Sequence, residues 1–348
     1  MPSSIALPSS PDAVQQSTKS LTRHSFSFVD GNIALLAKDQ YFVVHQGVVC
    51  RHSAILKCDI KKMITHSPET TPEGIPYLRL QDAPEDLCHF LTALYDGVSE
   101  LKYDKGNFEI VASLLHLSTK YRVAHLRKQL LRGMTAMWPN NLTDWDLRES
   151  NVTSESGVYE PRTVIPHPIL VINLARDVNA PEVLPAAFYD LSRSLPARVA
   201  QGYTCPKTQD LHQLSQADLL ASLKGREHAS RFLSTFLVNC VEGRTPSPLC
   251  IYRRQHMDIS RRRACQAAFE GITFEILRET NDIFCQRSSD PLFALMDALL
   301  ILTRVEDGRC FRPCEFCRAD FESAVEHARE DFWRMLPQWF GIDISTWV

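Results

Sequence analysis

The stretch of residues 30–63 constrains the fold most, because its hydrophobic period changes once along its length. Two short apolar runs, at residues 33–37 and 41–44, flank a polar turn. Such runs around a short turn are typical of a β-hairpin. After His45 the apolar spacing becomes helical, and Ser53 stands where it can cap a helix. A hairpin that leads directly into helices predicts an α+β domain.

The following residues extend this pattern. Residues 77–81 (YLRLQ) are expected to form a strand, and three amphipathic helices are expected between Asp82 and Met137 because apolar residues recur there three and four positions apart. Trp138 precedes a proline, which disfavours continued helix at that position. The sequence therefore predicts a small sheet followed by three helices.

Residues 30–53 (DGNIALLAKDQYFVVHQGVVCRHS) resemble the opening of a BTB/POZ domain, in which a strand pair leads to a buried histidine and a helix. Residues 77–81, 93–97 and 117–121 fit its later elements, and residues 333–341 resemble the tail of the BTB proteins expanded in mushroom-forming fungi. The resemblance implies an α+β fold: a BTB/POZ domain with a small sheet and flanking helices, followed by an all-α C-terminal region.

The same resemblance implies an interaction protein, a scaffold or adaptor that self-associates and recruits a second protein. Its dimer interface would include Phe26, Phe28, Val48 and Val49, related to their copies by a two-fold axis. His45 is interpreted as a structural residue whose ring atoms find hydrogen-bond partners within the domain. The alternative within this class is a transcription-associated scaffold.

Some BTB proteins are adaptors for cullin-type ubiquitin ligases, and that role uses an apolar-x-Glu element before the third strand. The nearest glutamates in this chain, Glu69 and Glu73, follow Ser-Pro and Thr-Pro dipeptides, so the element is not matched.

The chain is expected to divide into four parts. A disordered tail at residues 1–24, rich in serine, proline and glutamine, precedes the BTB/POZ domain at residues 25–137. A polar linker at residues 138–162, with Trp145 and Leu147 as candidate anchors, leads to a helical domain at residues 163–348, where strand-like alternation is missing. The last helix of that domain is expected to carry one apolar stripe, formed by Phe321, Val325, Ala328, Phe332 and Met335.

Composition excludes several classes of protein. The net charge of −3 gives no support for general nucleic-acid binding. No apolar run approaches the roughly 18 residues of a membrane span, and the N-terminus lacks the pattern of a secretory signal. The eleven cysteines are therefore expected to be reduced thiols in the cytoplasm or nucleus.

The spacing Cys310-x3-Cys314-x2-Cys317 is the one pattern with metal-binding potential. Thiolates clustered on a turn can bind zinc, but a fourth ligand is required, and His327, Cys285 or Cys265 is available only if the fold brings it close. Our interpretation is that these cysteines pack as small hydrophobic residues, so no bound metal is expected.

No catalytic signature accompanies these features. Phosphate-binding glycine loops, HExxH and GxSxG are missing, and the run Arg261-Arg262-Arg263 with Arg253 and Arg254 is interpreted as a solvated helix face. The sequence predicts a protein without enzymatic activity and without a cofactor. A metal-binding protein built on the cysteine turn is the remaining alternative.

Overall fold

The computed structural model describes residues 21–66, 68–155, 158–253, 259–280, 289–302, 313–345 and 347. The expected tail lies outside the described residues as far as residue 20, whereas its last residues include a short strand at Thr22–Arg23 (β1). The chain separates into two compact units. The N-terminal unit comprises residues up to 97 and residues 117–126, and the helical unit comprises residues 98–116 and 127–348.

The N-terminal unit contains the expected hairpin. Strand β2 (Ile33–Ala37) pairs antiparallel with β3 (Gln40–Val44), and Leu35 lies opposite Phe42. Strand β4 (Tyr77–Leu80) pairs parallel with β2, and β1 pairs parallel with β3, so the strand order is β1-β3-β2-β4. Every residue of β2 is buried, which explains why its sequence is continuously apolar rather than alternating.

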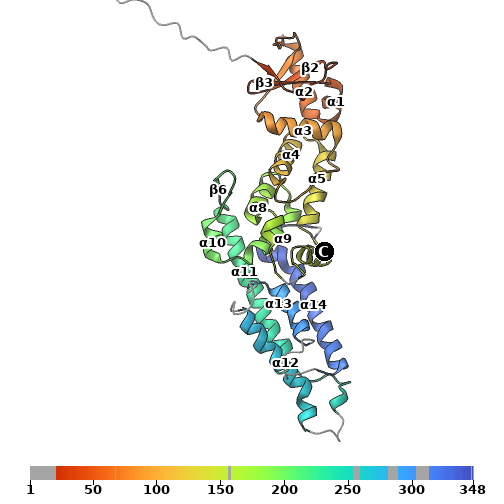
Figure 1. The fold of residues 1–348 in the computed structure, drawn as a ribbon, viewed down its shortest axis with the longest axis vertical. Coiled ribbons are helices and arrows are strands. Elements are labelled where there is room, and N and C mark those ends of the chain that lie inside the picture. The colour runs from red at the N-terminus through yellow and green to blue at the C-terminus, as the bar shows by residue number, and fades with distance from the viewer. Residues whose placement is uncertain are drawn as a thin grey trace, which may run out of the picture. The chain divides into compact units, whose positions relative to one another are not determined.

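Helices complete this unit, which has the expected α+β character (Figure 1). Helices α1 (Gln46–His52), α2 (Ala54–Thr65) and α3 (Pro84–Asp96) follow the strands. Helices α4 (Phe108–Lys120) and α5 (Ala124–Met137) are each divided between the two units. The expected apolar residues of α2, Leu56 and Ile60, are buried.

Ser53 joins α2 to the segment between α4 and α5. Its hydroxyl oxygen accepts a hydrogen bond from the Leu56 backbone N–H at 3.0 Å, as the sequence predicts for a helix cap, and its O–H donates to the Tyr121 carbonyl at 2.7 Å. Both bonds are buried, so neither partner can turn to water when the hydroxyl is removed.

We expect Ser53→Ala to lower the free energy of unfolding by about 2 kcal/mol, because the helix cap and the buried acceptor both lose their partner. Urea unfolding of the full chain measures the change. Thr65→Ala is the matched control, since it removes an exposed hydroxyl from the last turn of the same helix and surface changes cost less than about 0.5 kcal/mol. Equal effects of the two variants would contradict this role of Ser53.

The helical unit contains helices of varied length. Its elements, in chain order after α5, are α6 (Leu142–Asn151), α7 (Pro161–Val164), α8 (Pro168–Asp177), the 3-10 turn η1 (Pro181–Val183), α9 (Leu184–Ser192), α10 (Pro196–Gln201), β5 (Tyr203–Thr204), β6 (Leu211–His212), α11 (Gln216–Phe236), the π-helical turn η2 (Leu237–Val241), the 3-10 turn η3 (Ile251–Arg253), α12 (Ile259–Thr280), α13 (Pro291–Ile301) and α14 (Glu315–Phe340).

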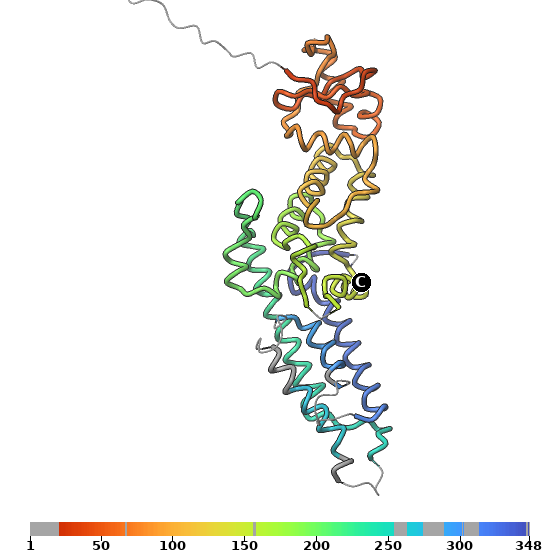
Figure 2. The backbone as a smooth tube through the Cα atoms, in the orientation of Figure 1, coloured from red at the N-terminus to blue at the C-terminus, as the bar shows by residue number. Residues whose placement is uncertain are grey.

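Two packing arrangements organise this unit. All nine residues of α9 are buried, and the helix packs against α8, α11 and α14. Beyond α9, the helices α11 to α14 lie side by side in a bundle (Figure 2). The apolar stripe predicted for the last helix forms much of the bundle core: Phe321, Val325, Ala328 and Phe332 are buried.

Two features differ from the sequence-based expectations. The expected linker at residues 138–162 holds α6, and its Trp145 is buried in the helical unit against Tyr189 and Trp333. The C-terminal region is not purely helical, because β5 and β6 form an antiparallel hairpin. None of the described helices is both long enough and apolar enough to span a membrane.

Candidate functional site

Four aromatic side chains gather where β3 leads into α1, and we call them the aromatic surface cluster: Phe26, Phe28, His45 and Tyr95. The ring of Phe28 stacks on Tyr95 with centroids 4.5 Å apart, and Phe26 meets Phe28 edge-on at 5.5 Å. All four are half-buried, so each ring presents part of its area to solvent. Phe26 and Phe28 do not lie in a strand.

His45 has partners for both ring nitrogens. Its Nδ1 lies 3.0 Å from the Tyr95 hydroxyl, and its Nε2 lies 3.1 Å from a carboxylate oxygen of Asp30. The Tyr95 hydroxyl also accepts the His45 backbone N–H at 3.0 Å. This arrangement supports the structural interpretation of His45, although the ring is half-exposed rather than fully buried.

The four residues expected at a dimer interface have different environments. Phe26 and Phe28 belong to the aromatic surface cluster, and Val48 is half-buried on α1. Val49 is wrong as an interface residue, because it is 0% exposed in the core of the N-terminal unit. The sequence did not single out Val29, whose side chain follows Phe28 and is 98% exposed.

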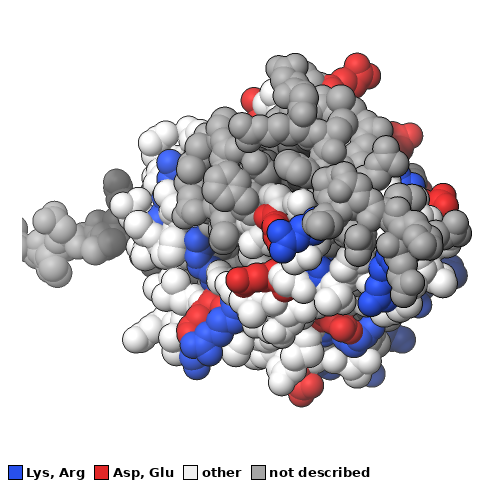
Figure 3. All heavy atoms as spheres, turned by 90° about the horizontal axis from the view of Figure 1, so that it is seen from below, with Lys and Arg blue, Asp and Glu red and all other residues white. Residues whose placement is uncertain are grey.

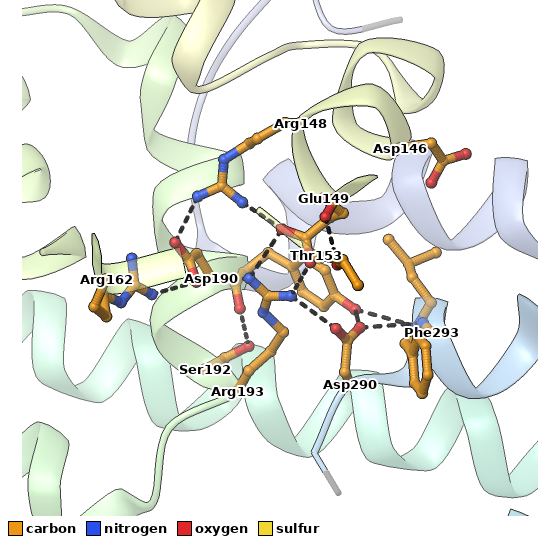
Figure 4. Close-up of polar contacts among 12 residues, drawn as sticks. Asp146, Arg148, Glu149, Thr153, Arg162, Asp190, Ser192, Arg193, Asp290 and Phe293 are labelled. Atoms are coloured by element: carbon orange, nitrogen blue, oxygen red, sulfur yellow. Dashed lines mark hydrogen bonds and ion pairs between the residues drawn. The ribbon is translucent and has the colours of Figure 1, made fainter. Parts of the chain in front are cut away.

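A buried ion network lies in the helical unit around Arg193, at the end of α9 (Figure 4). One guanidinium nitrogen of Arg193 is 2.7 Å from Glu149 and 2.7 Å from Asp290, and the other is 2.7 Å from Asp190. Asp190 also pairs with Arg148 of α6 at 2.7 Å. The network thereby joins α6, α9 and the start of α13.

The arginines of the network keep the Asp190 carboxylate charged. Burial alone would raise the pKa of Asp190, but the guanidinium groups of Arg162, Arg148 and Arg193 hold that pKa well below its usual range. Burial raises the pKa of Tyr189, whose hydroxyl donates to Asp290 at 2.6 Å. Removing one partner of such a buried pair leaves an uncompensated buried charge, which is strongly destabilising.

A cleft of about 410 Å³ opens beside the network and is lined by Trp145, Asp146, Glu149, Ser150, Thr153, Asp290, Leu292, Phe293, Met296 and Arg329. Burial raises the pKa of Asp146, which Arg329 partly opposes through an ion pair at 2.6 Å. The carboxylates of Glu149 and Asp290 are paired with Arg193. The polar lining of the cleft is therefore largely satisfied within the protein, and its open area is aromatic and aliphatic.

Four buried cysteines converge elsewhere in the helical unit. Cys250 lies between η2 and η3, Cys265 on α12, Cys314 at the N-cap of α14 and Cys317 in its first turn. All four sulfur atoms lie within 4.8 Å of one another. We call these residues the four-cysteine cluster.

Backbone N–H groups surround the sulfur atoms. The Ser247 N–H donates to the Cys317 sulfur at 3.3 Å, and the Cys314 N–H donates to the Cys265 sulfur at 3.2 Å. Burial alone would raise the pKa of Cys314, but N–H donors from Cys317 and Ile251 lower it to about 7. Burial raises the pKa of Cys265 to about 11.

The sequence anticipated only part of this cluster. Cys314 and Cys317 were expected to share a turn, and Cys265 was one of three suggested fourth ligands. Cys310 and Cys285 lie outside the described residues. His327 is not in the cluster; its ring nitrogen lies 2.7 Å from the Ser323 carbonyl of its own helix.

Cys250 was missed, because its nearest cysteine in sequence, Cys240, is ten positions away and forms no short Cys-x-x-Cys pair with it. Its nearest cluster partner in sequence, Cys265, is 15 positions away, with part of the intervening chain outside the described residues. Only the tertiary structure, which brings Cys250 beside Cys265 of α12 and Cys314 at the start of α14, reveals the association.

Only two of the five arginines considered as a basic patch have side chains that the structure describes. Arg253 and Arg263 are exposed, whereas the side chains of Arg254, Arg261 and Arg262 lie outside the described residues. On the face of the molecule drawn in Figure 3, basic and acidic side chains are interspersed among the residues that are coloured. The exposure of Arg253 and Arg263 agrees with a solvated surface.

Searches against known proteins give no identification: no family model matches this chain, and no curated protein sequence matches it.

Proposed function

We propose that this chain is a protein–protein interaction scaffold. Its N-terminal unit, which resembles a BTB/POZ domain in residues 30–53, self-associates as a two-fold dimer, and its helical unit recruits a second protein. The observation that carries the proposal is the aromatic surface cluster with Val29 beside it, 98% exposed.

Apolar area at this position favours association. Aromatic residues are enriched at protein interfaces, and a few central anchors usually supply most of the binding energy. Phe26 and Phe28 are held against Tyr95 within one chain, so their orientation is set before a partner arrives. Pre-organised anchors lose little conformational entropy on binding, which makes this surface suitable for a second copy of the same chain.

The helical unit is proposed to bind the recruited protein. The cleft beside the ion network offers Trp145, Phe293 and Met296 as apolar lining, and a partner side chain of matching size would bury this area. The ion network beneath it supports a binding role rather than catalysis, because its carboxylates are engaged with arginines.

The proposed partner is not a cullin. Glu69 and Glu73, the glutamates nearest to the position of the adaptor element, have partners within the N-terminal unit. Glu73 pairs with Arg23 at 3.1 Å and accepts from the Tyr41 hydroxyl at 3.1 Å, and Glu69 accepts from the Tyr77 hydroxyl. These contacts add to the mismatch in sequence.

We expect Val29→Asp to separate the dimer into folded monomers, because the charge is solvated in the monomer and desolvated in the interface. Light scattering is expected to give a mass near twice 39.5 kDa for the unmodified chain and near 39.5 kDa for the variant. Val49 is unsuitable for such a test, because it is 0% exposed and a charge there would destabilise the N-terminal unit itself.

Leu147→Asp is the control, since it places the same charge on an apolar residue that is 59% exposed in the helical unit. This variant is expected to remain dimeric. An unmodified chain that is monomeric at tens of micromolar would refute self-association, and a Val29→Asp dimer would exclude this surface as the interface.

A further inference from the structure

We propose that the four-cysteine cluster, formed by Cys250, Cys265, Cys314 and Cys317, is a structural zinc site. This inference concerns the helical unit alone and holds whether or not the chain self-associates. All four side chains are buried, and they come from three separate segments of the chain.

The distances between the sulfur atoms match those of a tetrahedral site. Zinc–sulfur bonds of about 2.3 Å place the four sulfurs of a regular tetrahedron about 3.8 Å apart. The Cys250 sulfur lies 3.8 Å from that of Cys265 and 3.7 Å from that of Cys314. Since all pairs fall within 4.8 Å, small side-chain rotations suffice to place every sulfur on one ion.

The backbone around the cluster suits bound thiolates. Four thiolates on one Zn²⁺ leave two negative charges, which burial disfavours unless hydrogen-bond donors surround them. The N–H groups of Ser247 and Cys314 point at the sulfurs of Cys317 and Cys265, and α14 begins at the cluster with the positive end of its dipole. These donors are supplied by the backbone and do not depend on a further side chain.

Other states of four neighbouring cysteines fit less well. A disulfide needs sulfur atoms about 2.05 Å apart, whereas the cysteines of the cluster are free. A cluster of several irons binds its cysteines through different metal atoms, and this separates the sulfurs further than one shared ion does. Calcium and magnesium prefer oxygen ligands. Four sulfurs in tetrahedral positions are typical of zinc or of a single iron ion, and elemental analysis distinguishes the two metals.

A zinc ion here would act as a cross-link. Four protein ligands leave no open position for water or substrate, so the site is structural rather than catalytic. Binding releases the protons of the thiols to solvent and joins the segment before η3, helix α12 and the start of α14. Cys250 and Cys314 are 64 residues apart in sequence, so the ion would link segments that are distant along the chain.

The first test uses the full chain as purified without chelator under reducing conditions. We expect one zinc per chain by elemental analysis. Replacement by Co²⁺ is expected to produce the visible absorption of a tetrahedral thiolate site. Absence of metal, iron in place of zinc, or disulfides among the four cysteines detected by mass spectrometry would overturn the proposal.

A pair of matched variants locates the ion. Cys265→Ser is expected to lose zinc, whereas Cys240→Ser, which changes a half-buried cysteine of η2 in the same unit, is expected to retain it. Zinc retained by Cys265→Ser would place the ion elsewhere and overturn the assignment. If Cys265→Ser does not fold, chelation of the unmodified chain decides: the melting temperature should fall when zinc is removed and recover with zinc but not with magnesium, and an unchanged melting temperature would overturn the structural role.

Discussion

Asp190→Asn is expected to destabilise the protein by about 3–5 kcal/mol, the range found when one partner of a buried ion pair is removed. Asp190 is 1% exposed and pairs with Arg148, Arg162 and Arg193. Asparagine keeps the shape of the side chain but not its charge, so buried guanidinium groups lose a compensating carboxylate. Thermal or urea unfolding of the full chain measures the loss.

Asp331→Asn is the control for this variant. Asp331 pairs with Arg334 at 2.6 Å, as close as the buried pairs, but both side chains are exposed. An exposed pair contributes about 0–1 kcal/mol, because water solvates either charge when the other is removed. A similar cost for the two variants would show that burial does not govern the contribution of Asp190.

The dependence of stability on acidic pH tests the contribution of the same Asp190 carboxylate. Because the folded pKa of Asp190 lies well below the ordinary value of 3.8, the unfolded chain binds its proton more readily than the folded chain. Its contribution to stability is therefore complete above that ordinary value and is lost as the pH falls below it toward the folded pKa. Asp190→Asn should lose less stability than the unmodified chain over this acidic range, and parallel pH profiles would contradict the pairing.

Phe321→Ala is expected to cost about 3–5 kcal/mol, the usual range for removing a large aromatic side chain from a core. Phe321 is 0% exposed at the centre of the bundle of α11 to α14, where its ring lies 5.3 Å from that of Phe269 and beneath the guanidinium of Arg244. No neighbour within a close-packed core can fill the resulting cavity completely. The midpoint of chemical denaturation reports the change.

Phe316→Ala provides the matched control, because it removes the same ring from the same helix where the side chain is 39% exposed. Both substitutions also introduce alanine into α14, so differences in helix propensity largely cancel. We expect the control to cost less than about 1 kcal/mol. If it costs as much as Phe321→Ala, the proposed core position of Phe321 is wrong.

Local periodicity accounts for the parts of the fold that were predicted correctly. The hairpin of β2 and β3, strand β4 and the buried stripe of α14 each follow from apolar residues repeated at the spacing of one element. The cap at Ser53 is equally local, because its partner Leu56 is three residues away. Its second bond, to Tyr121, could not be foreseen.

The candidate sites, in contrast, are formed by residues that lie far apart in the sequence. Trp145 in the expected linker was recognised as an anchor, but its contact with Trp333 joins residues far apart in sequence. The resemblance to a BTB/POZ domain placed Val49 at an interface, and an apolar residue on a short helix can face either the core or a partner. Its burial was decided by the packing of α1 against α2, which has no counterpart in the spacing of one helix.

The sequence by itself determined the α+β character of the N-terminal unit and the helical character of most of the remaining chain, because hydrophobic period and capping act over a few residues. Only the tertiary structure decided that Asp190 neutralises arginines from three segments and that Cys250 lies beside Cys314. A charge or thiol carries no periodic signal that identifies a partner tens of residues away. Such groups are brought together by the helices whose apolar faces pack first, and the chemistry of both sites follows from that packing.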